Sequence, residues 1–92
     1  MVIEIRLNQT PIKVYEYMEE LENGLHRITV SFKVTSEEYH DIAVLLYQET
    51  FDIQVPEQGL NFRGRITNYS TSITNLYEKG NVGDYQVTFS EI

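Results

Sequence analysis

The sequence predicts a mainly β domain of the α+β class. We expect a small, strongly curved antiparallel sheet or barrel of about six strands, with one helix at about residues 36–48. Apolar and polar side chains alternate through most of the chain, as they do in half-buried strands. Asparagine, glycine and proline separate these runs, and one segment has the period of an amphipathic helix.

The predicted helix extends from Ser36 to Gln48. Thr35 and Glu38 have the spacing of a capping box, which marks the start of the helix. Because the apolar side chains recur at intervals typical of one helical face, we expect this face to contact the core. These side chains are Tyr39, Ile42, Ala43, Leu46 and Tyr47.

The first half of the chain contains three predicted strands. Asn8–Pro11 is expected to form a turn after the first strand, and Asn23 with Gly24 a hairpin turn before the third. Strands connected in this way are expected to form an antiparallel meander that leads into the helix. The three strands are Met1–Leu7, Ile12–Glu19 and Leu25–Val34.

Three further strands are predicted after the helix. Gly64 lies in the second of them, where an interior glycine indicates a bulge or a bend that curls the sheet. Ser70–Tyr77 has features of a helical turn and of extended or irregular chain, and we expect a loop with some strand character. Glu78–Asp84 contains the glycines of a turn. The three strands are Phe51–Val55, Leu60–Tyr69 and Tyr85–Ser90.

The length and composition indicate one small globular domain, residues 1–92. The chain contains no cysteine, which excludes disulfides, thiolate metal sites and cysteine nucleophiles. It has neither a leader-like start nor an apolar run of membrane-spanning length. We therefore expect a cytoplasmic protein.

Acidic residues outnumber lysine and arginine by 14 to 7, which gives a net charge of −7. This charge disfavours nucleic acid and anionic membranes as partners. Between Val34 and Phe62 there are six acids and no lysine or arginine, and Glu16, Glu19, Glu20 and Glu22 form a second cluster. We interpret these acids as a solvated surface, with docking against a basic partner as the alternative.

Arg63 and Arg65 are the first candidate binding residues. At strand spacing they point to the same face, on either side of Gly64, where two guanidinium groups could receive an anion or a carboxylate. The more common alternative is an ordinary cross-strand ion pair with one of the many surface acids.

Tyr69 and Tyr77 are the second pair of candidates. They lie in the sequence NYSTSITNLY, residues 68–77, which combines tyrosine with serine, threonine and asparagine. This composition is typical of adaptable recognition surfaces. A turn with many hydrogen bonds has the same composition and is the more common explanation.

The sequence contains little that indicates catalysis. Glu37, His40 and Asp41 have the spacing of a weak metal motif, but a capped, solvent-facing first turn of the helix explains them better. His26 lies on the apolar face of its strand. No nucleophile elbow, phosphate-binding glycine loop or zinc-protease motif is present. We expect no catalytic residue, metal or cofactor.

Two long stretches resemble a known family. KVTSEEYHDIAVLLYQ, residues 33–48, and FRGRITNYSTSITNLYEKGNVGDYQVTF, residues 62–89, are similar to the YkvR-like family of small Bacillus-type proteins, which is catalogued as a domain of unknown function. The resemblance implies a small β-barrel-like domain with one helix, from a Gram-positive cytoplasm. It implies no catalytic or binding residue. The final segment also resembles, in style, small β-rich components of phage tails.

Three functions remain open. The first and favoured one is a non-enzymatic binding or interaction module, a monomer or dimer that holds an unknown protein or small ligand. The second is a structural protein of the phage-tail kind, which would assemble into rings or larger oligomers through strand edges and the Glu78–Asp84 tip. The third is a small enzyme that uses His26 or His40.

Overall fold

The computed structural model describes residues 3–72 and 80–92, which form seven strands, one α-helix and one short 3-10 helix. The helices are α1 (Tyr39–Leu46) and η1 (Pro56–Gln58). The strands are β1 (Glu4–Leu7), β2 (Thr10–Lys13), β3 (Glu16–Glu22), β4 (Leu25–Thr35), β5 (Phe51–Val55), β6 (Leu60–Thr71) and β7 (Val82–Glu91).

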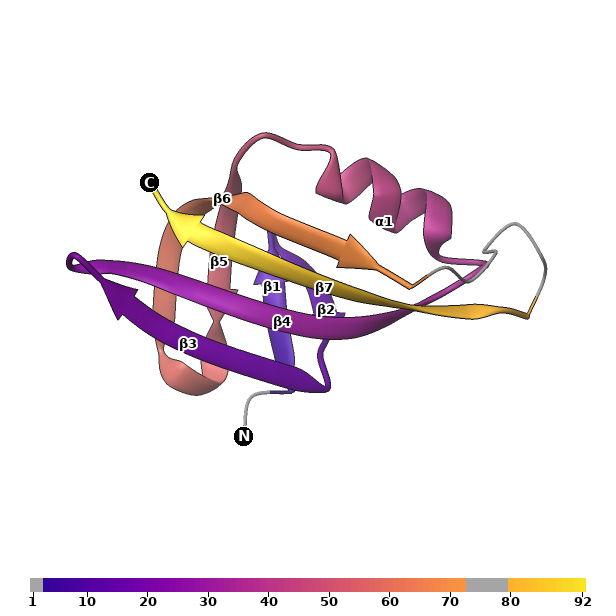
Figure 1. Cartoon of the computed structure of the whole chain (residues 1–92), viewed down its shortest axis with the longest axis horizontal. Coiled ribbons are helices and arrows are strands. Elements are labelled where there is room, and N and C mark those ends of the chain that lie inside the picture. Colours follow the sequence, from indigo (N-terminus) through magenta and orange to yellow (C-terminus); the bar gives the residue numbers. More distant parts are fainter. Residues whose placement is uncertain (1–2, 73–79) are drawn as a thin grey trace.

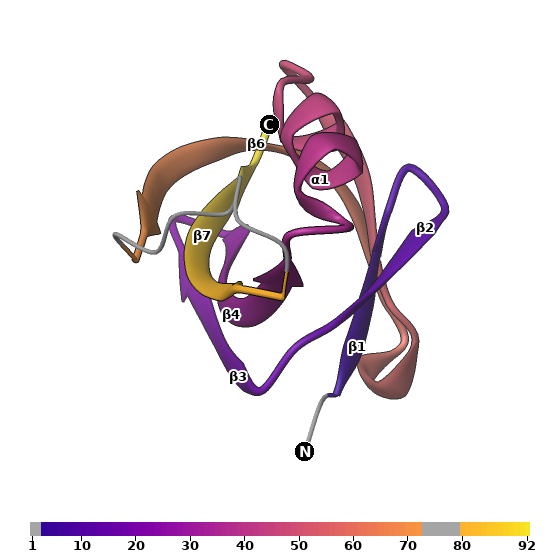
Figure 2. The same ribbon diagram turned by 90° about the vertical axis from the view of Figure 1, so that its right-hand side faces the viewer.

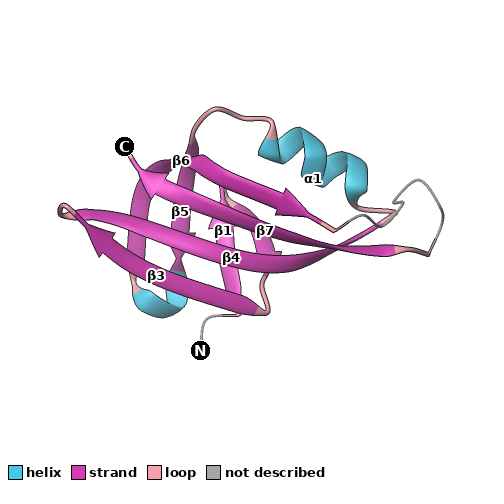
Figure 3. Cartoon of the chain, in the orientation of Figure 1, coloured by secondary structure: helices cyan, strands magenta, loops and turns pink. Residues whose placement is uncertain are grey.

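The seven strands form one sheet in the order β2-β1-β5-β6-β7-β4-β3, and every neighbouring pair is antiparallel. The long strands β3, β4, β7 and β6 lie side by side, and β5, β1 and β2 cross behind them (Figure 1). Viewed along the molecule, the sheet is strongly curved, with α1 above one opening (Figure 2). Figure 3 shows how much of the fold is strand. The predicted fold class is confirmed, as a curved sheet that does not close into a barrel.

The predicted strand Ile12–Glu19 is wrong, because the chain changes partner in its middle. Val14 donates its backbone N–H to the carbonyl of Ile3, at 2.9 Å, whereas Tyr15 donates to Ser31 in β4, also at 2.9 Å. The strands β2 and β3 therefore lie at opposite edges of the sheet instead of forming one strand of a meander. Side-chain alternation reports which residues are extended but not which strand each of them joins.

The core lies inside the curve of the sheet. Its side chains come from every strand except β3, and they include the two aromatic rings of Phe51 and Phe89, whose centroids are 5.5 Å apart in an edge-to-face arrangement. The other buried apolar residues are Ile5, Leu7, Ile12, Val14, Ile28, Val30, Phe32, Val34, Ile53, Val55, Phe62, Tyr85 and Val87.

Strand β6 connects the two halves of the sheet. Gly64 is the residue that pairs on both sides, with Phe51 of β5 and with Glu91 of β7. Before it, β6 pairs with β5; after it, β6 pairs with β7. The predicted role of Gly64 at a bend is consistent with this position, although the bulge itself lies three residues later, between Ile66 and Asn68.

The helix α1 is shorter than the predicted segment. Thr35 and Glu38 do form reciprocal hydrogen bonds, with each backbone N–H donating to the other side chain at 3.3 Å, but these close a turn before the helix. Ile42 and Leu46 pack against the core as expected. Tyr47 was predicted to face the core, and this is wrong: it follows the last helical residue and is 91% exposed.

The remaining predictions concern turns and the last strand. Asn23 and Gly24 have positive φ angles of 53° and 79° and form the β3–β4 hairpin turn, as predicted. Strand β7 begins at Val82, inside the predicted Glu78–Asp84 turn, and β6 continues to Thr71. Residues 73–79 lie outside the described residues. They include most of the predicted loop at residues 70–77.

Candidate functional site

A groove separates α1 from the second half of β6. Its volume is about 710 Å³, within the range of pockets that hold small ligands. Its walls are the second half of α1, the loop to β5, part of β6 and the end of the chain. The lining residues are Ala43, Leu46, Tyr47, Gln48, Glu49, Thr50, Arg65, Ile66, Tyr69 and Ile92, and we call this site the α1–β6 groove.

The bulge in β6 determines which of its side chains reach the groove. Ile66 pairs with Phe89 and Tyr69 with Val87, so that both side chains lie on the core-facing side although they are three residues apart. Without the extra residue, Thr67, simple alternation would place them on opposite faces. The bulge thus brings two large side chains together beneath α1.

Tyr69 and Tyr85 form an aromatic pair at one end of this site. Their ring centroids are 5.8 Å apart and the rings are nearly perpendicular. Burial, together with the neighbouring Tyr69, raises the pKa of the Tyr85 hydroxyl to about 12. Tyr85 therefore stays protonated at neutral pH and supports Tyr69, which remains 49% exposed at the groove.

The two candidate arginines have different surroundings. Arg63 donates to Asp52 Oδ1 and to Thr50 Oγ1, both at 2.9 Å, and Asp52 is its cross-strand neighbour. The ordinary ion pair is thus the correct explanation for Arg63. Arg65 lines the groove and makes no ion pair within residues 3–72 and 80–92. The structure therefore separates the predicted pair and retains Arg65 at the site.

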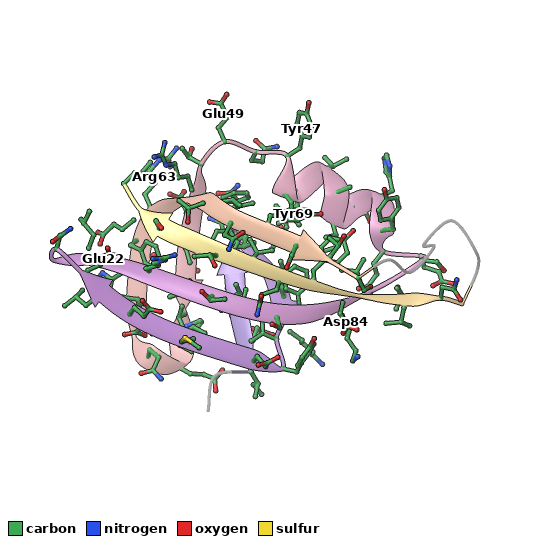
Figure 4. All side chains as sticks on the ribbon, viewed as in Figure 1. Glu22, Tyr47, Glu49, Arg63, Tyr69 and Asp84 are labelled. Atoms are coloured by element: carbon green, nitrogen blue, oxygen red, sulfur yellow. The ribbon has the colours of Figure 1, made fainter. Side chains whose placement is uncertain are left out.

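Of the two candidate tyrosines, Tyr69 lies in the groove and Tyr77 lies outside the described residues. Sequence reasoning missed the contributions of Ala43, Gln48 and Ile92. Tyr47 and Glu49 point away from the sheet at the outer side of the site, while Tyr69 lies between β6 and α1 (Figure 4). The apolar residue Ile92, close after the last predicted strand, is a signal in the sequence that could have been noticed.

The end of β7 is anchored beside this groove. The Glu91 carboxylate accepts hydrogen bonds from the backbone N–H of His26 at 2.8 Å and from its Nδ1 at 3.0 Å. These bonds hold the pKa of Glu91 below its usual range. The His26 ring also stacks on Phe62, with centroids 5.7 Å apart. His26 is therefore a structural residue that fastens the strand end next to Ile92.

A second ionisable cluster lies outside the groove. Asp84 Oδ1 accepts hydrogen bonds from Lys33 Nζ at 3.1 Å and from the Tyr15 hydroxyl at 3.0 Å. These two donors lower the pKa of Asp84, whereas burial and the Asp84 carboxylate raise the pKa of Tyr15. The cluster therefore connects β4 and β7 to Tyr15, the residue at which the chain begins to pair with β4.

The weak metal motif gains no support from its surroundings. Glu37, His40 and Asp41 are all exposed at the start of α1. Among the residues that the structure describes, no three histidine, aspartate or glutamate side chains are grouped closely enough to hold a metal ion. In the same part of the chain, no helix has the length and apolar character needed to cross a membrane.

Comparison with known proteins identifies relatives over nearly the whole chain. The uncharacterized protein YkvR of Bacillus subtilis (strain 168) is 51% identical over 88 residues, which cover 96% of this chain and 91% of that protein. The NMR solution structure of YkvR from Bacillus subtilis matches all of this chain and 87% of its own, with a TM-score of 0.65 and 50% identity. The family described as "Protein of unknown function (DUF3219)" matches residues 4–92, and the chain belongs to this family.

Proposed function

We propose that the protein is a non-enzymatic binding module that holds its ligand in the α1–β6 groove. The observation that carries this proposal is the combination of a largely apolar groove with a guanidinium group, Arg65, that no described acid neutralises. A site with an apolar interior and a few polar groups is typical of ligand binding. A ligand with an apolar body and one negative group fits this chemistry.

Two polar side chains that line the groove support the same ligand class. Arg65 offers several N–H donors to a carboxylate or sulfonate, and Tyr69 offers a hydroxyl. Glu49 lines the groove as well but points away from the sheet (Figure 4). A negative group is therefore expected on the β6 side, next to Arg65.

A fluorescent probe tests the site directly. Anilinonaphthalenesulfonate has an apolar ring system and one sulfonate, and its emission increases in apolar surroundings. The matched variants are Ala43→Trp, which fills the groove, and Val44→Trp, which places the same side chain on the exposed side of the same helix. We expect Ala43→Trp to weaken binding by about tenfold or more and Val44→Trp to leave it unchanged.

NMR spectroscopy gives an independent readout of the same titration. The amide signals of Ala43, Ile66 and Tyr69 should shift when the probe binds, whereas those of the distant β3 should not. Equal binding by both tryptophan variants, or shifts confined to other surfaces, would show that the groove is not the binding site.

The absence of catalysis and the cytoplasmic location are parts of this proposal that need their own tests. An activity that disappears when both His26 and His40 are replaced would favour a small enzyme instead. Cell fractionation with an antibody would test the location. Neither result depends on the probe experiment.

A further inference from the structure

We propose that the ligand of the α1–β6 groove is an extended peptide segment of another protein, which pairs with the free edge of β6 as an additional strand. This inference rests on the proposed function, because it names the class of partner for the same groove. The backbone of the second half of β6 supports this inference.

Within residues 3–72 and 80–92, the second half of β6 has a partner strand on one side only. The pairing of β6 with β5 ends at Gly64, because its partner Phe51 is the first residue of β5. From Arg65 to Thr71, the described partner of β6 is β7. The α1–β6 groove lies along this edge. The helix α1 lies across from β6 (Figures 1 and 2).

The direction of the backbone groups follows from the hydrogen bonds at the two ends of the β6–β7 ladder. Ile92 donates to the carbonyl of Arg63 at 3.0 Å, and Ser72 donates to the carbonyl of Asp84 at 2.8 Å. Hydrogen-bonded residues alternate along an antiparallel strand, and the bulge between Ile66 and Asn68 shifts this alternation by one residue. Counted back from Ser72, the backbone groups of Tyr69 and Thr71 therefore point away from β7. They therefore lie along the free edge of β6.

One of these edge groups already has a substitute acceptor. The backbone N–H of Tyr69 donates to the side-chain oxygen of the preceding residue, Asn68, at 2.9 Å. A backbone carbonyl from an added strand would take the same position. The side chain of Asn68 thus occupies the place that the carbonyl of an added strand would take at this edge.

The side chains around the edge specify the peptide. An added strand would alternate its side chains between the core-facing side, where Ala43, Leu46 and Ile66 lie, and the solvent. The peptide is therefore expected to have apolar residues at alternate positions. A carboxylate close to Arg65 would supply the missing counter-charge. A segment of about six residues, roughly 20 Å long, matches the length of this edge.

A second copy of the chain is a poorer occupant of this edge. Each copy carries its own α1 beside the same part of β6 (Figure 1), so that edge-to-edge pairing would bring two helices together. Each copy also has a net charge of −7, which opposes self-association. A single extended segment avoids both problems.

The first experiment is a selection from a phage-displayed library of random linear heptapeptides against the purified protein. The same library is applied to Ala43→Trp and to Val44→Trp. We expect peptides that bind the wild type and Val44→Trp but not Ala43→Trp, with alternating apolar residues and an acid. A selection that enriches no such peptide would overturn the inference.

A second experiment separates pairing with the edge from simple occupation of the groove. Thr71→Pro removes the backbone N–H that points to the free edge, without removing a hydrogen bond to β7, and Thr71→Ala is its matched control. We expect the selected peptides to bind Thr71→Pro about tenfold more weakly and Thr71→Ala normally. Binding of the sulfonate probe should be the same in both variants, which also shows that the groove is intact.

The outcomes distinguish the two proposals. Peptides that bind Thr71→Pro and Thr71→Ala equally well would overturn strand addition and leave the groove as a ligand site. If Ala43→Trp binds the sulfonate probe as tightly as the wild type does, the proposed function itself is overturned. If the wild type forms a dimer and Ala43→Trp stays a monomer, the occupant of the groove is a second copy of the chain. This result would contradict the peptide inference.

Discussion

Gly64 and Ser90 approach so closely that a side chain at position 64 would force its neighbours to move. A β-carbon on Gly64 would lie 2.8 Å from the carbonyl oxygen of Ser90 and 3.0 Å from the side chains of Ile53 and Phe62. The close contact occurs where β6 passes from one partner strand to the other. It allows the sheet to curve tightly at this point.

Gly64→Ala should therefore reduce the free energy of unfolding. We expect a loss of about 1–3 kcal/mol, because the neighbouring backbone and two buried side chains must move. Urea unfolding followed by circular dichroism measures it. Asn61→Ala, at an exposed position of the same strand, should change the stability by less than about 0.5 kcal/mol. Equal effects of the two variants would show that the contact with Ser90 can relax.

Arg63 and Arg65 provide a matched pair of substitutions with opposite expected effects. Arg63→Gln removes the exposed ion pair with Asp52 and should lower the free energy of unfolding by about 0.2–1 kcal/mol. Arg65→Gln should leave stability unchanged but weaken binding of the sulfonate probe, because its guanidinium lines the groove. Urea unfolding and a fluorescence titration measure the two quantities. If Arg63→Gln weakened probe binding and Arg65→Gln lowered the stability, Arg63 would be the residue that binds the anion.

The hydrogen bonds between Glu91 and His26 predict a dependence of stability on acid pH. The pKa of Glu91 is lower in the folded protein, so the unfolded chain binds the proton more tightly. The contribution of Glu91 is therefore present above the ordinary carboxyl pKa of about 4.3 and is lost as the pH falls through the folded pKa. Glu91→Gln should be less stable than the wild type at pH 7, and the difference should shrink toward pH 3. Urea unfolding at both values tests this; a constant difference would contradict it.

The acidic edge strand β3 leads to a prediction about oligomeric state. All four of its glutamates are exposed: Glu16, Glu19, Glu20 and Glu22. Charged side chains on an edge strand oppose pairing with another sheet. We expect light scattering to show a monomer, or at most a dimer, over a wide concentration range. Rings or growing assemblies would instead support the structural function.

The regular parts of the fold were predictable from local patterns. Alternation along β4 and the Asn23-Gly24 turn depend on residues that are neighbours in sequence, and both predictions are confirmed. The division between β2 and β3 was not predictable, because Val14 and Tyr15 continue the extended pattern while their backbones pair with different strands. Pairing partners depend on the whole sheet.

The candidate site was predictable in part. Arg65 and Tyr69 were singled out from residue type and spacing, and both line the groove. Their neighbour Arg63 was not distinguishable from Arg65, since the position of Asp52 opposite one of them depends on the register of β5 with β6. Ile92 reaches the site because β7 ends beside β6.

The mainly β class, the position of one helix and most of the extended segments follow from local sequence, because they depend on the period of the side chains and on turn residues. The position of the α1–β6 groove, by contrast, depends on tertiary contacts. The groove requires the bulge near Thr67, the end of β5 pairing at Gly64 and the placement of α1 across from β6. These features arise from contacts between distant segments, whose side chains give no local signal of one another.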